Sequence, residues 1–179
     1  MAADREAPAG VRIVRAAPEH VAALPAIEVA AAALFTPDDV PPAMAAAPTS
    51  IPDLVEGQAA GRLFVALRSE GAPIGFALLG ARDGRAHLLE IDVHPEQGGR
   101  GVGRALLGAV FAAAAAAGHR AVTLTTFSHV PWNAPFYARM GFRALAPGEL
   151  TPELRLTLAK EAERGLDPAK RVAMRRELP

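Results

Sequence analysis

The segment HPEQGGRGVGRALL, residues 94–107, concentrates the backbone groups with which a protein can hold an anion. Four glycines lie within six residues, and residues that favour helix follow at once. Glycines allow unusual φ angles and leave room for a ligand at the backbone. The N–H groups of such a loop and of the first helical turn point at a bound anion, and the helix dipole adds favourable potential. Arg100 and Arg104 would add positive charge at the rim, so the segment predicts a phosphate-binding loop.

Three kinds of phosphate site compete for this loop. A Walker A loop requires Lys and then Ser or Thr after its last glycine, and neither follows Gly103. A dinucleotide fingerprint begins with Gly101 and Gly103 but has Leu106 where its third glycine belongs, and the strand that follows ends without the acidic residue expected for a ribose. The third kind is the pyrophosphate of coenzyme A, which the loop alone does not distinguish from a structural turn.

Glu90 and Asp92 have the residue types and the spacing for proton transfer. They are two apart in a predicted strand, so both side chains point to the same face, whereas His87 points to the other face unless a bulge intervenes. Burial and a neighbouring carboxylate could raise the pKa of Glu90 enough for base catalysis. An ordinary strand carboxylate paired with an arginine is the competing interpretation, and both stay open.

The elements that must position these groups follow from local patterns. Alternating and β-branched runs predict strands at residues 11–14, 63–68, 74–80, 86–94, 121–127 and 171–178, the second and third of which form an antiparallel hairpin. Capping residues, Pro and Gly predict helices after Pro18 with a kink at Pro25, and over 53–61, 101–117, 133–140 and 152–164. The Pro-rich residues 36–52 predict a loop, and residues 1–10 a disordered leader. Because no repeat or linker is present, residues 11–179 are expected to form a single α/β (α+β) sheet domain.

Composition excludes several functional classes. The 179 residues carry no net charge, with a pI of about 7.0, so nothing in the global field suggests nucleic acid or an anionic membrane as partner. The absence of cysteine excludes disulfides, thiolate metal sites and a cysteine nucleophile, and fits a cytoplasmic protein. No His, Asp and Glu have metal-ligand spacing, so no metal is expected. The N-terminus lacks the apolar run of a signal peptide, and no stretch of about 18 apolar residues could span a membrane.

The C-terminal region adds one basic cluster, formed by Arg171, Arg175 and Arg176. In a strand, such a cluster most simply represents a solvated face.

The segment VHPEQGGRGVGRALL resembles the acyl-CoA pyrophosphate motif of the GNAT superfamily of N-acetyltransferases, which runs from the end of a strand through [QR]-x-x-G-x-[GA] into a helix. The resemblance continues in order with the strand AVTLTTF and a short helix ending FYARMGF (136–142), similar to the family's second motif. It covers most of residues 63–143. There are two departures: Gly98 occupies the usual Gln or Arg position, one residue after Gln97, and Val130 occupies the position of an Asn often found seven residues before the tyrosine.

The resemblance implies a mixed, mostly antiparallel central sheet flanked by helices, with strands that splay apart at the acyl-CoA site. The pyrophosphate would lie on the backbone of Gly99, Arg100, Gly101, Val102, Gly103 and Arg104. The pantetheine arm would lie between the diverging strands and bond to the backbone of Ile91, Asp92 and Val93. Tyr137, the only tyrosine, aligns with the family residue that donates a hydrogen bond or proton to the CoA sulfur, and its phenol, with a pKa of about 10, suits that role. Asn133 would either contact the cofactor or cap the helix that carries Tyr137.

The acceptor side is expected near Glu28, Phe35, His129 and Trp132. His129 follows the splayed strand and has an imidazole suited to proton transfer near neutrality, so the base could be Glu90, His129 or water.

Taken together, these patterns predict an N-acetyltransferase that moves an acetyl group from acetyl-CoA to an amine of a small molecule or protein by direct attack. A non-catalytic acyl-CoA-binding module is the alternative from another class, and a dinucleotide-binding oxidoreductase is disfavoured by Leu106. The sequence leaves open a homodimer.

Overall fold

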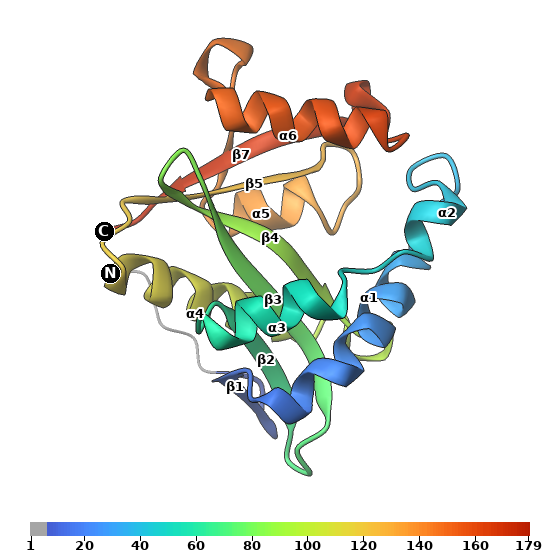
Figure 1. The fold of residues 1–179 in the computed structure, drawn as a ribbon, viewed down its shortest axis with the longest axis vertical. Coiled ribbons are helices and arrows are strands. Elements are labelled where there is room, and N and C mark those ends of the chain that lie inside the picture. The colour runs from blue at the N-terminus through green and yellow to red at the C-terminus, as the bar shows by residue number, and fades with distance from the viewer. Residues whose placement is uncertain (1–6) are drawn as a thin grey trace.

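The computed structural model describes residues 7–179 as one seven-stranded sheet with helices on both faces (Figure 1). The spatial order of the strands is β1-β2-β3-β4-β5-β7-β6. Their bounds are β1 Val11–Arg15, β2 Leu63–Arg68, β3 Pro73–Arg82, β4 Arg85–Val93, β5 Ala121–Phe127, β6 Arg143–Ala144 and β7 Arg171–Glu177. All neighbours pair antiparallel except β4 and β5, which are parallel. The predicted mixed, mostly antiparallel sheet is therefore confirmed.

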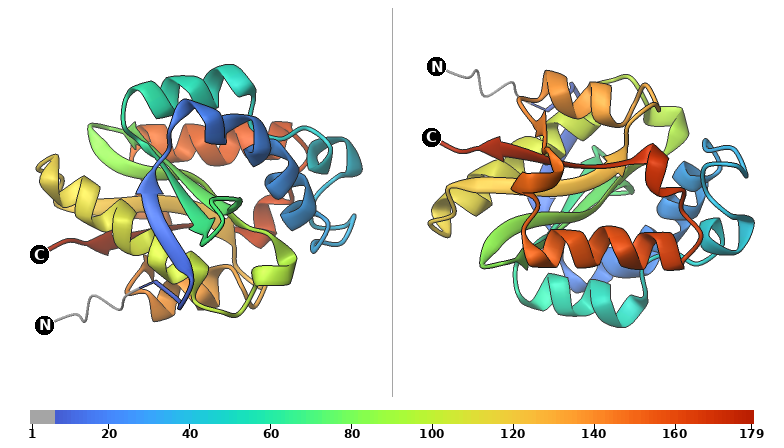
Figure 2. Two further views of the ribbon diagram at one scale, coloured as in Figure 1. Left: turned by 90° about the horizontal axis from the view of Figure 1, so that it is seen from below. Right: turned by 90° about the horizontal axis from the view of Figure 1, so that it is seen from above.

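Within residues 7–179, six α-helices connect the strands, together with short 3₁₀ turns. Their bounds are α1 Leu24–Ala32, α2 Pro42–Ala45, α3 Ile51–Ala59, α4 Val102–Ala116, α5 Ala134–Arg139 and α6 Pro152–Glu163. Figure 2 shows α4 and α5 on one face of the sheet and α1, α3 and α6 on the other.

The two faces bury separate hydrophobic clusters. On the α4 face, alternate residues of the central strands pack on Val102, Leu106 and Val110 of the helix. On the other face, Phe76 and Leu78 pack with Leu24 and Leu54 of α1 and α3. Since neighbouring residues of a strand point to opposite faces, β2 and β3 contribute to both clusters and are buried along most of their length.

Two expected elements need correction. The segment 36–52 is not a continuous loop, because α2 forms within it and α3 already begins at Ile51. Ser50 sets that start as the N-cap: its hydroxyl accepts a hydrogen bond from the Asp53 N–H at 3.2 Å. Pro25 does not kink a long helix but lies in the first turn of α1, after a separate 3₁₀ turn at Pro18–Ala23.

The predicted leader falls partly outside the described part of the chain, since residues 1–6 are not described. Residues 7–10 lie against the domain: the Gly10 carbonyl accepts a hydrogen bond from the Ser69 hydroxyl, and the Val11 N–H donates to the Pro8 carbonyl. Among residues 7–179, no helix is both long and apolar enough to cross a membrane.

Helix α4 offers a matched pair of glycines for testing its stability. Gly108 lies mid-helix with nothing within 4 Å of an added Cβ, whereas Gly118, after the helix, has a φ of +80°. We expect Gly108→Ala to raise the melting temperature by a few degrees, because alanine lowers the entropy cost of the helix by about 0.5–1 kcal/mol. Gly118→Ala should lower it, because an alanine there is strained. Thermal denaturation of both variants checks this, and a destabilised Gly108→Ala would contradict the helix geometry.

Candidate active site

Strands β4 and β5 separate part-way along their length. Only two pairs join them among the described residues, Ala86 with Val122 and His87 with Thr123. Beyond these pairs the strands run on to Val93 and Phe127 without pairing to each other. The predicted splaying is confirmed, and it leaves the facing edges of both strands without a neighbouring strand.

The glycine loop lies directly after β4 and has a backbone shape suited to an anion. Gly99 and Gly101 have φ angles of 71° and 91°, and α4 begins immediately after Gly101. In the described chain, the N–H groups of residues 99–104 donate to no backbone carbonyl. An added Cβ at Gly99 would meet nothing within 4 Å, so space is open beside the loop. These free donors at a helix N-terminus fit a pyrophosphate.

Two arginines accompany the loop. Arg100 donates to the side-chain oxygen of the buried Gln97 at 3.5 Å, which ties this arginine to the turn before the glycines. Arg104 is exposed on the first turn of α4. Gln97, one residue before the usual motif position, thus orients a cationic side chain.

A bulge in β4 determines which side chains share a face. Leu79 of β3 pairs with Leu88, but the adjacent Leu78 pairs with Glu90, so Leu89 is the extra residue. His87 pairs with Gly80, two residues from Leu78, and so shares a face with Glu90 after all. His87 is buried, and its Nδ1 lies 2.8 Å from the Thr123 hydroxyl. Burial and, to a lesser extent, Arg82 lower the pKa of His87 to about 4. His87 therefore stays neutral at the paired end of the strands.

Three carboxylates meet on this face of the sheet: Glu90, Asp92 and Glu28, hereafter the carboxylate cluster. Glu90 and Asp92 point to the same side, as expected, and α1 brings Glu28 over them, so that an oxygen from each lies within 4.8 Å of the other two. The Thr49 N–H donates to both Glu28 oxygens at 3.0 Å. Spacing along the sequence indicated no such cluster, because Glu28 comes from a separate helix. Groups of this kind can hold a cation.

The cluster is electrostatically unusual. Burial and the charge of Glu28 raise the pKa of Glu90 to about 7. Burial and the charges of Glu90 and Glu28 raise the pKa of Asp92 well above its ordinary value. Burial also raises the pKa of Glu28, against the opposing effect of its hydrogen bonds from Thr49. One Asp92 oxygen, Oδ2, is buried without a hydrogen-bond partner among residues 7–179. The cluster can therefore accept a proton near neutral pH and has an acceptor oxygen that the described chain leaves unused.

Tyr137 reaches the same region from the opposite face of the sheet. It is buried on α5, with its ring 5.7 Å from that of Phe142. Burial and the charges of Glu90 and Asp92 raise the pKa of Tyr137 far above its ordinary value. The phenol is therefore a hydrogen-bond donor that stays protonated, and its pKa makes full transfer of its proton to a thiolate less favourable than the sequence suggested.

Asn133 occupies the N-cap position of α5, but its side chain makes no cap hydrogen bond, so the predicted capping role is wrong. Its side-chain oxygen instead accepts a hydrogen bond from the Thr126 hydroxyl at 2.6 Å, and no cap hydrogen bond forms from its side chain. Thr126 lies on β5, directly alongside the helix start, and competes successfully for the amide oxygen. The bond ties α5, and with it Tyr137, to the splayed strand.

The expected acceptor residues Phe35 and Trp132 come together with Phe127 in an aromatic cluster. The Phe35 ring lies 5.2 Å from Phe127 and 6.0 Å from Trp132, whose side chain is 50% exposed. Arg171 stacks on Phe127 at 4.4 Å, and its charge acts on Glu90. The aromatic cluster thus gathers at the Phe127 end of β5, beside the start of β7 at Arg171.

The His129 side chain contacts a carboxylate instead of standing free in its loop. Its Nε2 lies 3.0 Å from Asp39, which also accepts a hydrogen bond from Lys170 at 2.9 Å. The Lys170 ammonium holds the pKa of Asp39 below its ordinary value. The three side chains connect the segment between α1 and α2 to the loops that follow β5 and precede β7.

The expected solvated face at the C-terminal arginines is wrong. Arg171 forms a largely buried pair with Glu161 at 2.9 Å, the two side chains being 10% and 15% exposed. Arg176 stacks on Phe111 at 3.9 Å and donates to the Met140 carbonyl, while Arg175 pairs with Glu177. Each arginine contacts a group from another element or a neighbouring residue, which the sequence pattern could not show.

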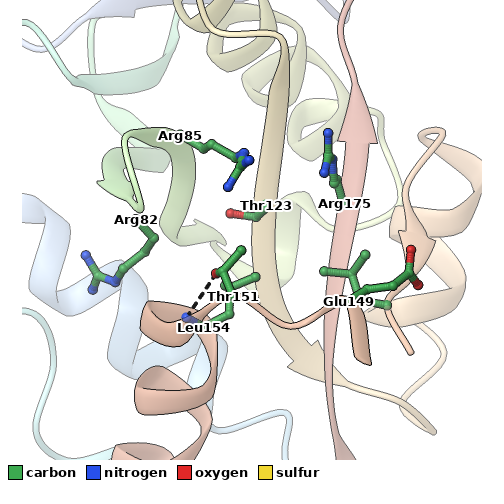
Figure 3. Close-up of a pocket in the computed structure, with 8 residues that line it drawn as sticks. Arg82, Arg85, Thr123, Glu149, Thr151, Leu154 and Arg175 are labelled. Atoms are coloured by element: carbon green, nitrogen blue, oxygen red, sulfur yellow. Dashed lines mark hydrogen bonds between the residues drawn. The ribbon is translucent and has the colours of Figure 1, made fainter. Parts of the chain in front are cut away.

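A small cavity lies away from this chemistry, at the paired end of β4 and β5 (Figure 3). Arg82, Arg85 and Arg175 line it together with Thr123 and the start of α6. None of the residues predicted for catalysis or cofactor binding lines it.

The comparisons with known proteins agree with this geometry. A family model described as the acetyltransferase (GNAT) family matches residues 28–142, which is more than half of the chain. The chain belongs to the GNAT family. The matched segment includes the splayed strands, the glycine loop and Tyr137.

Solved structures share the GNAT fold. The ribosomal-protein-S18-alanine N-acetyltransferase from Escherichia coli is 19% identical, with 94% of each chain covered and a TM-score of 0.65. A GNAT acetyltransferase from Staphylococcus aureus is 16% identical, covers 94% of this chain and 99% of its own, and has a TM-score of 0.68. N-acetylglutamate synthase from Neisseria gonorrhoeae, complexed with coenzyme A and N-acetyl-glutamate, is 19% identical with a TM-score of 0.68; it covers 98% of this chain, which spans only 36% of that protein. Membership of the acetyltransferase (GNAT) family, rather than these fold matches, identifies the protein as an acetyl-CoA-dependent acyltransferase.

The raised pKa of Glu90 has a consequence for stability. Between about pH 4.5 and 7 the folded chain binds a proton at Glu90 that the unfolded chain has lost, so the free energy of unfolding falls as pH rises through this window. We expect Glu90→Gln to melt several degrees above the wild type at pH 8, with the difference shrinking at pH 5. Glu19→Gln, the same change at an exposed position, should shift neither melt. A Glu90→Gln variant less stable than wild type at pH 8 would contradict the buried, costly charge.

Proposed function

We propose that the protein is an N-acetyltransferase in which a primary amine attacks acetyl-CoA directly, with Glu90 as general base and Tyr137 as hydrogen-bond donor to the departing sulfur. The observation that carries the proposal is the meeting of Glu90 and Tyr137 at the separation of β4 and β5. The charge of Glu90 raises the pKa of the Tyr137 phenol, although the two side chains reach this point from opposite faces of the sheet. An acyl donor between the strands would have a base on one side and a hydroxyl on the other.

The glycine loop supports the placement of the donor. Residues 99–104 offer unused N–H groups at the start of a 15-residue helix, and they follow β4 directly. A pyrophosphate bound there directs the rest of the donor along the exposed edges of Ile91, Asp92 and Val93. Asn133 keeps an amide N–H₂ group without a partner in the described chain, which leaves it able to contact the donor.

The chemical step begins with the amine as an ammonium ion. Glu90, with a pKa of about 7, takes one proton and leaves a neutral nucleophile. The amine nitrogen then forms a bond to the acetyl carbon while the carbon–sulfur bond breaks. The attacking nitrogen then loses a second proton to form the neutral amide. That proton neutralises the thiolate, so CoA leaves as the thiol.

Tyr137 donates a hydrogen bond to the sulfur and keeps its own proton. An alkyl thiol has a pKa of about 8.5, far below that of the buried phenol. Transfer of the proton from the phenol to the thiolate is therefore unfavourable. A hydrogen bond from the phenol needs no rearrangement during the reaction and becomes stronger as negative charge develops on the sulfur.

A non-catalytic acyl-CoA-binding module is the second candidate, favoured only by the general suitability of the loop for binding. It gives no reason for a carboxylate cluster with raised pKa values opposite a buried hydroxyl. The Tyr137→Phe variant below separates the candidates, because a binding module has no turnover to lose.

Binding of the donor is expected to raise the melting temperature. At about 100 times its dissociation constant, a ligand adds roughly 2.7 kcal/mol, which corresponds to a shift of about 5–10 °C. Acetyl-CoA and CoA should produce this shift, and NAD should not. Gly101→Glu should abolish it through backbone strain, bulk and negative charge, while Gly108→Ala on the same helix keeps it. A full shift in Gly101→Glu would overturn the placement of the pyrophosphate.

Removing the Tyr137 hydroxyl should separate catalysis from binding. Tyr137→Phe keeps the ring that packs on Phe142, so we expect a normal melting shift with acetyl-CoA. Its kcat should fall by about 100–1,000-fold, the effect of losing one donor to developing charge. Release of CoA thiol with a primary amine measures kcat. An unchanged kcat would rule out the role of Tyr137 at the sulfur.

A further inference from the structure

We propose that the acceptor is a small monoamine with an aromatic or apolar body, whose single ammonium group binds to the carboxylate cluster while its body packs on Phe35 and Trp132. The proposal rests on the proposed function, because it assigns the acceptor of that same site.

The carboxylate cluster provides for one cation. Oxygens of Glu28, Glu90 and Asp92 lie within 4.8 Å of one another, close enough for a single –NH₃⁺ group to reach all three. The buried Oδ2 of Asp92 has no hydrogen-bond partner in the described chain, and an ammonium N–H would supply one. Both Glu28 oxygens are held by the Thr49 N–H, so this carboxylate is fixed in place before any ligand arrives.

The other side of the site is aromatic. Phe35 packs on both Phe127 and Trp132, and half of the Trp132 side chain is exposed. The segment that carries Phe35 also exposes Val29 and Leu34. An exposed indole on a packed aromatic base offers a flat, rigid surface for a ring or an alkyl chain.

The charges around the aromatic cluster disfavour a polycation. Asp39 is already paired with Lys170 and His129, and Glu161 is paired with Arg171. The exposed Arg164 lies close enough for its charge to act on Glu28. A second ammonium group would therefore meet cations, paired acids and the exposed carboxylate of Asp38 near Lys170, whereas the uncharged body of a monoamine meets aromatic rings.

The test compares kcat/KM of the wild-type enzyme, at saturating acetyl-CoA, for primary amines that differ in the group attached to the amine. We expect kcat/KM for phenethylamine to exceed that for n-propylamine and for spermidine by at least about tenfold.

Trp132 is the only tryptophan, so its emission should change saturably as phenethylamine is added to the CoA-loaded protein. Trp132→Ala should lower kcat/KM for phenethylamine by about two- to tenfold, the usual range for an aromatic contact, and by less for n-propylamine. Glu28→Gln, which keeps an oxygen for the Thr49 N–H, should raise KM for both monoamines.

Controls separate this inference from the proposed function. Leu156→Ala, at an exposed position on α6, should behave as wild type with every amine. Failure of acetyl-CoA to protect the wild type from melting would overturn the proposed function itself. If acetyl-CoA protects but spermidine or a lysine-containing peptide is the better acceptor, or no arylalkylamine is acetylated, only the monoamine assignment fails. A divalent cation such as Mg²⁺ that raises the melting temperature through the carboxylate cluster, and not in Glu28→Gln, would also overturn it.

Discussion

The separation of β4 and β5 is the feature on which the rest of the site depends. A parallel pair that stayed hydrogen-bonded to its end would leave no room for an extended ligand between the strands. Here the ladder stops after His87 and Thr123, where a buried imidazole and a hydroxyl bond across the two strands. Past that point β4 is held by β3 and β5 by β7, so each strand keeps one complete edge and leaves the other open. The opening also lets groups from both faces of the sheet, Glu90 and Tyr137, approach the same point.

The site is held at a cost to stability. Three carboxylates lie together in a partly buried place, and burial raises the pKa of each. Such a group is expensive when ionised, and the described chain supplies no cation that contacts the carboxylate cluster directly. The surrounding structure fixes the carboxylates nonetheless: Thr49 holds Glu28, and the bulge at Leu89 turns Glu90 and Asp92 toward it. The burial and mutual repulsion of the carboxylates lower stability, and they also produce a base with a pKa near 7. An ammonium ligand would reduce this repulsion.

Local patterns were sufficient to predict every strand except the two-residue β6, together with the long helix after the glycine loop and the loop itself, because turn, cap and alternation signals act within a few residues. The same alternation placed Glu90 and Asp92 on one face. Contacts between distant segments could not be predicted in this way. Glu28 joins the carboxylate cluster through the packing of α1. The Asn133 side-chain oxygen accepts a hydrogen bond from Thr126 instead of from its own helix. Arg171 is buried against Glu161 of α6. The bulge at Leu89 left no clear signal, since consecutive leucines fit a buried strand equally well.

The most direct test of the account is the pH dependence of kcat/KM for an amine of ordinary basicity, in the wild type and in Glu90→Gln. This parameter reports the ionisation of the free enzyme and the free amine. If the carboxylate cluster deprotonates a bound ammonium, kcat/KM should rise to about pH 7 and then level off, and Glu90→Gln should lose this inflection. A profile that climbs without a break through pH 9 in both proteins, following the neutral amine in solution, would contradict the assignment of Glu90 as the base.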